Sequence, residues 1–382
     1  MAGSEGENFG PGVVEYVGIL ELADGERHGQ LIDLRSNGRE DVSNPYVGAD
    51  VIRRYHLKRG QKISATVLPR TDFPNSKVLA VGRIDDMLPD ERNRCIPFER
   101  LTPTQPREQI TLECHGCSLS SRIIDLFCPI GKGQRGIIVS PPRSGKTLLL
   151  HEIARSIAKN FPKIAVIVAL IDERPEEVTD FQRSIGAEIY ASSNDQGVKN
   201  HVRIARLAGE RAKNLAESGR DVVLFIDSMT RLVRAHNAIG GTGHTMSGGI
   251  DARAMEIPRK MFALARDTEN GGSLTVVATA LIETGSRMDD LIFQELRGTG
   301  NLEIVLSRKL AELRIWPAID LHASGTRREE LILSPKMFNG VSFLRRAFAG
   351  VESEKATESL IKRLSQYGSN FEFLALIAKS AG

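Results

Sequence analysis

The stretch 135–153, RGIIVSPPRSGKTLLLHEI, constrains the fold of this chain more than any other part of its sequence. A short β-branched run leads into a loop that ends in Gly145-Lys146-Thr147, and an apolar-periodic helix follows. Strand, tight loop and helix in this order are the context that makes such a loop a phosphate-binding loop. Unpaired N–H groups at the helix start, aided by the helix dipole, hold polyphosphate oxygens. The residues expected to contact nucleotide are Pro142, Arg143, Ser144, Gly145, Lys146, Thr147 and Leu148.

Within this loop, two side chains have predicted chemical roles. Lys146 would reach the β- and γ-phosphates, and the hydroxyl of Thr147 would bind Mg²⁺. One position departs from the general pattern, because Ser140 stands where the first glycine is expected. The alternative is an ordinary strand, turn and helix with a lysine on the surface.

Composition narrows the class of protein. At 382 residues the chain is long enough for two or three domains, and 41% apolar with 26% charged residues is ordinary for a globular protein. The net charge of +3 is nearly balanced, so nucleic-acid binding would depend on local clusters of basic residues. No run of eighteen apolar residues occurs, and the start MAGSEGENFGPG lacks the apolar core of a signal peptide. We therefore expect a cytoplasmic protein with no membrane segment.

Four cysteines, Cys95, Cys114, Cys117 and Cys128, are too few for a disulfide framework. Two of them form a C-x-x-C sequence, but a zinc site requires a second such pair or a pair of histidines at suitable spacing. A metal site is therefore disfavoured, and ordinary free thiols are expected.

The order of patterns along the chain predicts an α/β protein preceded by a small β-barrel. Residues 1–12 form a loose tail, and 13–88 contain short strands with one small helix near 49–56, typical of an OB-fold-like barrel. Such a barrel could bind single-stranded nucleic acid or be merely structural. Residues 89–130, rich in Pro, Arg and Glu, form a connector.

From 131 to 350, strands and helices alternate, and a helical segment completes the chain at 351–382. The apolar runs 164–171, 222–226 and 274–280 are typical of strands buried on both faces of a parallel sheet.

Two acidic residues follow buried strands in this region. Asp227 comes directly after one apolar run, as a Walker B carboxylate that binds Mg²⁺ does, and Glu173 closely follows another. In open α/β sheets the ligand lies at the carboxyl ends of the strands, so both acids are expected beside the phosphates. Glu173 is the candidate that deprotonates the attacking water. The alternative is that it caps the next helix.

Further candidates lie in loops. Two segments, 236–251 with His244 and 283–301 with Arg287, combine glycines with cationic side chains that suit a sugar-phosphate backbone, or are simply solvated loops. Trp316 would pack in the core or stack on a purine. Arg327 would be a surface residue or an arginine finger directed at a neighbouring subunit.

Several segments together resemble the Rho family of bacterial transcription termination factors, which are homohexameric RecA-like RNA translocases. The segments include PIGKGQRGIIVSPPRSGKT, LIDERPEEVTDFQR, VVLFIDSMTRLVRAHN, SGGIDARAM, RGTGN and WPAIDLHASGTRREELIL. They extend from about residue 129 to 334, and weaker similarity continues through 50–57 and 98–103. The resemblance implies a RecA-like sheet, ATP and Mg²⁺ as cofactors, single-stranded RNA as ligand, and RNA polymerase with elongation factors as partners.

The resemblance also implies roles for residues at matching positions. Lys146, Glu173, Asp227 and Arg327 would be catalytic, with Asp227 and Thr147 toward Mg²⁺, Arg327 acting across the subunit interface, and Trp316 stacking on adenine. Arg174, Arg231, Arg308 and Arg314 match arginines around the nucleotide interface. The residues that would grip RNA in the channel are His244, Thr245, Gly248, Gly249 and Arg287.

Three departures from the family's pattern affect RNA binding. His244 and Arg287 replace lysines, and a neutral histidine would weaken the grip and make it sensitive to pH. The barrel strand 31–35 lacks the family's aromatic residues, which leaves Tyr46 and Arg35 as the plausible RNA contacts, and Asp33 would repel phosphate. The small helical segment that usually precedes the barrel is absent from this sequence. These differences predict weakened or relocated RNA loading with an intact motor.

Two other readings remain open. A rotary or secretion-type ATPase subunit shares the RecA-like core, and RNA-stimulated ATP hydrolysis would separate it from an RNA motor. The other is an RNA clamp that ATP merely closes and that does not hydrolyse ATP repeatedly. Loss of Glu173 would produce such a clamp, yet Glu173 is present in this sequence.

Overall fold

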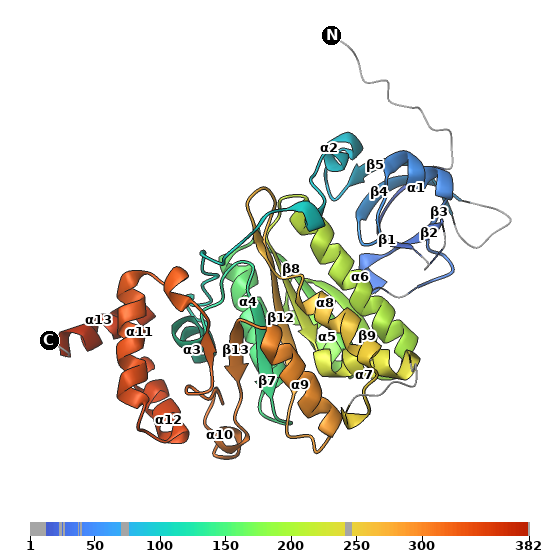
Figure 1. Ribbon diagram of the computed structural model, residues 1–382. Coiled ribbons are helices and arrows are strands. Elements are labelled where there is room, and N and C mark those ends of the chain that lie inside the picture. The colour runs from blue at the N-terminus through green and yellow to red at the C-terminus, as the bar shows by residue number, and fades with distance from the viewer. Residues whose placement is uncertain are drawn as a thin grey trace, which may run out of the picture. The chain divides into compact units, whose positions relative to one another are not determined.

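The computed structural model describes residues 13–22, 25, 27–36, 38, 40–69, 76–240 and 247–380 (Figure 1). The chain divides into two compact units, Met1–Pro97 and Phe98–Gly382. The tail expected at 1–12 lies outside the described residues. No helix in the described part of the chain has both the length and the apolar character needed to cross a bilayer.

The first unit is a closed five-stranded barrel, coloured blue in Figure 1, with strand order β1-β2-β3-β5-β4 and β4 paired back to β1. Its strands are β1 (Val14–Leu22), β2 (Gly29–Ile32), β3 (Tyr46–Val47), β4 (Lys62–Leu68) and β5 (Lys77–Ile84). Helix α1 (Ala49–Tyr55) connects β3 to β4, where the sequence predicts a short helix. Its helical elements also include η1 (Leu34–Ser36) and α2 (Pro89–Asn93).

The alternation of buried and more exposed residues along the strands explains why they form a barrel. Ile63, Ala65 and Val67 of β4 are buried while the residues between them are partly exposed, so one face of each strand points to the interior. Leu20 and Leu31 from the neighbouring strands complete the same core. The predicted β-barrel in front of an α/β domain is confirmed.

The second unit is built on a seven-stranded sheet of order β14-β13-β7-β12-β10-β8-β9. All neighbouring strands are parallel except β13 and β14, which are antiparallel. The strands are β7 (Arg135–Ser140), β8 (Ala165–Glu173), β9 (Glu188–Ser193), β10 (Val222–Asp227), β12 (Leu274–Leu281), β13 (Leu302–Val305) and β14 (Gly325–Thr326). A separate ladder pairs β6 (Pro103–Thr104) with β11 (Asp267–Thr268).

Helices connect and cover these strands. The helices are α3 (Leu119–Phe127), α4 (Lys146–Asn160), α5 (Pro175–Ser184), α6 (Val198–Glu217), α7 (Met229–Ile239), α8 (Glu256–Phe262), α9 (Arg287–Thr299), α10 (Arg308–Glu312), α11 (Pro335–Phe348), α12 (Ser353–Leu364) and α13 (Asn370–Ser380). Short 3₁₀ turns are η2 (Phe98–Arg100), η3 (Ser247–Gly249), η4 (Ala252–Met255) and η5 (Glu329–Leu331).

Alternate residues of the sheet belong to one large core. Ile138, Val168 and Phe225 cluster with the apolar residues of α3, α4, α11 and α12, so these helices cover one face. Helices α6, α7 and α9 contact the same strands from outside that cluster and cover the opposite face. Burial on both faces is the reason for the continuous apolar runs in the sequence.

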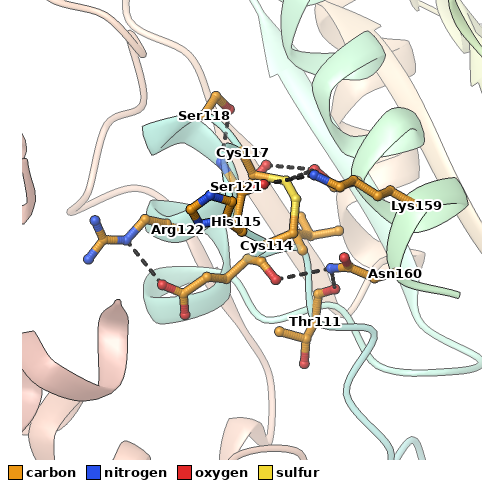
Figure 2. The surroundings of a disulfide bond; sticks show 12 residues. Thr111, Cys114, His115, Cys117, Ser118, Ser121, Arg122, Lys159 and Asn160 are labelled. Carbon is orange, nitrogen blue, oxygen red and sulfur yellow. Dashed lines mark hydrogen bonds and ion pairs between the residues drawn. A yellow bond between two sulfur atoms is a disulfide. The ribbon is translucent and has the colours of Figure 1, made fainter. Parts of the chain in front are cut away.

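The expectation of four free thiols is wrong for two of them. Cys114 and Cys117 form a disulfide, whereas Cys95 and Cys128 are free (Figure 2). Gly116 adopts φ +76°, and the N–H of Cys117 donates to the oxygen of Cys114 over 3.0 Å. This tight turn brings the two Cα atoms to 5.2 Å, within the range that a disulfide requires.

Candidate functional site

The loop between β7 and α4 is held in shape by its own side chains. Ser140 and Ser144 share a hydrogen bond of 2.9 Å between hydroxyls, and the Ser144 hydroxyl donates to the oxygen of Pro141 over 2.8 Å. Arg143 and Gly145 have φ of +65° and +89°. Such turns direct backbone N–H groups toward an anion. Ser140 therefore replaces the usual glycine without opening the loop.

Lys146 is held between two buried carboxylates. Its Nζ lies 2.8 Å from Glu173 Oε1 and is also ion-paired with Asp227. The side chains of Glu173 and Asp227 are only 3% and 1% exposed. Burial alone would lower the pKa of Lys146, but the charges of Asp227 and Glu173 raise it above its usual value. The predicted phosphate-binding lysine and the two predicted acids therefore lie together.

Glu173 has the electrostatics of a base that works near neutral pH. Burial, followed by the charge of Asp227, raises the pKa of Glu173 to about 7, against the opposing charges of Lys146 and Arg231. Arg231 Nη1 lies 2.9 Å from Glu173 Oε2. A base whose pKa matches the operating pH transfers protons efficiently.

A bulge in β8 determines where Glu173 points. The register of β8 with β9 shifts between Ile171 and Glu173, and the intervening Asp172 has φ +58°. Asp is among the few side chains that tolerate this conformation. Arg231 donates to the oxygen of Asp172, and Asn194 N–H donates to the oxygen of Glu173 over 3.0 Å. These bonds fix the strained residue and with it the direction of Glu173.

The oxygen atoms around Asp227 suit a hard cation. The Thr279 hydroxyl donates to Asp227 Oδ1 over 2.7 Å, while the buried Oδ2 has no hydrogen-bond partner among the described residues. The Thr147 hydroxyl lies nearby on α4 and donates to Glu177 Oε2 over 3.2 Å. No group of three or more His, Cys, Asp or Glu side chains forms a metal cage in the described ranges. Mg²⁺ bound to a nucleotide does not require such a group of side chains, since phosphates and water supply most of its ligands.

A cavity of about 260 Å³ lies beside the phosphate loop. A Cβ on Gly145 would come within 2.6 Å of Trp316 Cζ3, so the indole packs directly on the loop. The cavity lining is formed by α3, the start of α4 and the Trp316 loop, with Ser118, Leu119, Ser120, Leu148, Glu152 and Pro317 among its residues. Trp316 is 40% exposed rather than buried in the core.

Arg327 is not brought to the phosphate site of its own chain. It follows the edge strand β14 and lines a separate hollow with Thr326 and Glu329. Its side chain is exposed, and within the described ranges no residue pairs with its guanidinium. Arg345 stabilises this edge by donating to the oxygen of Phe127 over 2.6 Å.

The remaining matched arginines lie near the phosphate loop. Arg143, Arg308 and Arg314 line a cavity of about 650 Å³. Arg308 Nε lies 3.6 Å from Glu283 Oε2, and Arg174 is exposed at the start of α5.

The two glycine-containing loops predicted to contact RNA lie against each other. A Cβ on Gly248 would lie 3.2 Å from the oxygen of Arg287, which is exposed at the start of α9. Asn237 holds Gly249 by donating to its oxygen over 3.2 Å. His244 and Thr245 lie outside the described residues.

In the barrel, the two predicted RNA contacts have local partners. Arg35, whose side chain is 91% exposed, pairs with Asp33 over 2.9 Å, and this hydrogen bond lowers the pKa of Asp33. The charge of Asp33, expected to repel phosphate, is thus matched by a neighbouring cation. Tyr46 lies against His28 with 5.5 Å between ring centroids.

Sequence reasoning missed two residues of the site. Thr279 lies at the end of the buried run 274–280, and its position after an apolar strand was the available signal. Glu177 lies in the acidic first turn of α5, and nothing in the sequence separates it from its neighbour Glu176.

Comparison with known proteins agrees with this geometry. Residues 120–326 match the model of the ATP synthase alpha/beta family, nucleotide-binding domain. The transcription termination factor Rho of Streptosporangium roseum is 46% identical over 368 residues, covering 95% of this chain and 92% of that protein. Rho of Micrococcus luteus is 44% identical and covers 90% of this chain, which spans only 51% of that relative's length.

Solved structures show the same fold. A prototypical ATPase from a type III secretion system of pathogenic bacteria superposes with TM-score 0.57 at 25% identity, covering 65% of this chain and 72% of that one. The ATP synthase subunit NeqB from Nanoarcheaum equitans gives TM-score 0.60 at 21% identity, covering 74% and 81%. The identity over nearly the whole chain, together with the matched nucleotide-binding domain, confirms the resemblance: this chain belongs to the transcription termination factor Rho family.

Proposed function

We propose that this member of the Rho family, an ATP-dependent RNA translocase, binds ATP with Mg²⁺ in each subunit of a homohexameric ring. Hydrolysis takes place at the seams between subunits and pulls single-stranded RNA through the central channel. The observation that carries this proposal is the separation of Arg327 from an otherwise assembled site of Lys146, Glu173 and Asp227. A finger that cannot serve its own site is available to a neighbouring one.

The chemistry follows from the residues of this chain. The loop N–H groups and Lys146 hold the β- and γ-phosphates. Glu173 accepts a proton from the attacking water as the water oxygen bonds to the γ-phosphorus, and the bond from that phosphorus to the β–γ bridging oxygen breaks, so that ADP and phosphate are released. Arg327 of the adjacent subunit stabilises the charge that develops on the transferred group. Thr147 and Asp227 would hold Mg²⁺, which neutralises phosphate charge when bound. Trp316 provides the face on which the adenine stacks.

A mixed-ring experiment tests the role of Arg327. Lys146→Ala lacks a working site but keeps its finger, whereas Arg327→Ala lacks the finger but keeps its site. Each variant alone should show little RNA-stimulated ATPase activity. In randomly mixed rings, about a quarter of the interfaces join an intact site to an intact finger, so activity should reappear. Arg328→Ala is the matched control, because Arg328 is a neighbouring exposed arginine that pairs with Glu330. No recovery on mixing would contradict a finger that acts between subunits.

A second assay separates the motor from the other readings. ATP turnover with poly-C, with poly-A and without RNA should rise with RNA for a translocase, and a rotary or secretion-type subunit should be indifferent. Repeated turnover that Glu173→Gln abolishes would exclude an RNA clamp that ATP only closes.

RNA binding in the channel is assigned to the loops that contain Gly248, Gly249 and Arg287, together with His244 and Thr245. Their support is the contact between η3 and the start of α9, where Gly248 lies against the backbone of Arg287 and Arg287 is exposed. An exposed arginine can neutralise phosphate. RNA polymerase and its elongation factors are proposed as further partners, and the cytoplasm as the location, since nascent RNA is the substrate.

A further inference from the structure

The disulfide of the C-x-x-C sequence has no part in the ATPase chemistry proposed above. Cys114 and Cys117 are each partly exposed, and His115 and Gly116 between them are exposed. Figure 2 shows the sulfur atoms in a turn that precedes α3. A small dithiol or disulfide can therefore reach this bond.

The turn that holds the disulfide contacts two helices, α3 and α4. Cys117 directly precedes Ser118, the residue that caps the N-terminus of α3. The Lys159 ammonium donates to the oxygen of His115 over 2.7 Å, and the Ser156 hydroxyl donates to Cys117 Sγ over 3.7 Å. Side chains of α4 thus hold the turn at the residues on both sides of Gly116.

The residues that directly follow the turn line the cavity beside Trp316. Ser118, Leu119 and Ser120 follow Cys117 without a gap and line the 260 Å³ cavity together with Trp316. A change in the turn therefore reaches residues that would face the base of the nucleotide.

The turn is also fastened to the helix that begins at the phosphate loop. Asn160 at the end of α4 donates to the oxygens of Thr111 and Glu113 over 2.8 and 3.0 Å, and Ser156 of α4 shares a 2.9 Å hydrogen bond with Ser121 of α3. Both walls of the cavity are thus connected to the cross-linked turn.

We propose that Cys114 and Cys117 form a reversible redox site whose reduction weakens nucleotide binding. A dithiol reductant attacks one sulfur to form a mixed disulfide, and the other cysteine leaves as a thiolate that takes up a proton. The second thiol of the reductant then closes its own disulfide, so two electrons and two protons pass to the protein as two thiols. Loss of the cross-link makes the turn before α3 more mobile, together with the residues after it that line the cavity beside Trp316. The effect on binding rests on the nucleotide site proposed above.

The chain carries its own reporter for the test. Trp316 is the only tryptophan in the sequence and lines the cavity, so its fluorescence follows occupancy of the site. Full-length protein would be treated with dithiothreitol or with oxidised glutathione, freed of the reagent and titrated with MgADP. The reduced protein should have a Kd about 5-fold or more above that of the oxidised protein, the lower end of usual coupling between two sites. Counting thiols by maleimide labelling should show two more in the reduced form.

Variants locate the effect. Cys114→Ser with Cys117→Ser should match the reduced protein under both treatments, and Cys95→Ser, which removes another partly exposed thiol, should respond as the wild type does. Equal Kd values for oxidised and reduced wild type would overturn the coupling, a comparison that needs no variant. A pair that stays as two thiols in excess oxidised glutathione would overturn the redox site itself. Absence of MgADP binding in both forms would instead refute the proposed nucleotide site, and the thiol count would still decide the redox chemistry.

Discussion

Replacing Glu173 by glutamine should change how the stability of the second unit depends on pH. The folded chain holds the pKa of Glu173 at about 7, against 4.5 for an unperturbed glutamate, because the group is buried and lies near Asp227. The folded state therefore binds this proton more tightly than the unfolded state, and wild-type stability falls as pH rises from about 4.5 to 7. At 1.36 kcal/mol per pKa unit, the loss is about 3 kcal/mol in all, most of it between pH 5 and pH 8.

Glutamine does not titrate, so Glu173→Gln lacks this loss. Its free energy of unfolding, relative to wild type, should therefore increase by about 2–3 kcal/mol from pH 5 to pH 8, whatever the constant effect of the substitution. The assay is urea unfolding without nucleotide, at one protein concentration, followed by the fluorescence of Trp316. Glu176→Gln, which removes an exposed carboxylate from the first turn of α5, is the matched control and should show a flat difference. A flat difference for Glu173→Gln as well would refute the reasoning, because it would mean that Glu173 is already ionised in the folded chain at pH 5.

Substitutions at four further positions test other parts of the proposed function. Asp172→Val should strain the bulge by about 1–2 kcal/mol and lower kcat, whereas Asp172→Asn should keep most activity, because asparagine tolerates positive φ. Equal losses of kcat for the two variants in steady-state assays would show that the backbone conformation is unimportant. Thr279→Val removes the donor to Asp227 Oδ1 and should lower kcat about 10-fold with little change in KM for ATP. This is the effect of losing roughly 1.4 kcal/mol from one hydrogen bond to a charged group. An unchanged kcat would refute the role of Thr279. Arg287→Ala should weaken RNA binding and reduce the slope of log affinity against log salt concentration by about 1. Tyr46→Ala in the full chain should cost less binding free energy than the roughly 1–3 kcal/mol of one stacked base. A larger loss for Tyr46→Ala would show that the barrel still loads RNA.

Local patterns predicted most of the fold because the relevant interactions are themselves local. The run before the phosphate loop became β7, the periodic segment after it became α4, and the buried runs became β8, β10 and β12. Placing Glu173 and Asp227 together required one further rule, that parallel strands share a carboxyl edge. The strands β9, β13 and β14 were not predicted. Strands β13 and β14 have only four and two residues, and all three depend on their neighbours in the sheet for pairing.

Features that depend on the exact backbone conformation at one position could not be predicted. The direction of Glu173 depends on a bulge at Asp172, which exists only in the register of β8 with β9. The salt bridge that neutralises Asp33 depends on a turn that brings Arg35 back to it. The disulfide was missed because Cys114 and Cys117 were judged by the number of cysteines in the chain, whereas a local turn at Gly116 decides their distance.

Under the proposed function, the sheet order explains why one chain would carry two separable halves of a catalytic site. The acids and the phosphate loop follow β7, β8 and β10, which are all interior strands, whereas Arg327 follows the edge strand β14. An interior position lets the surrounding helices bury Glu173 and raise its pKa, and an edge position leaves a guanidinium exposed toward another molecule. The two halves therefore meet different physical requirements, desolvation for the base and exposure for the finger. The proposed head-to-tail ring would meet both at every interface, and for that reason the two halves should fail independently and complement each other when variants are mixed.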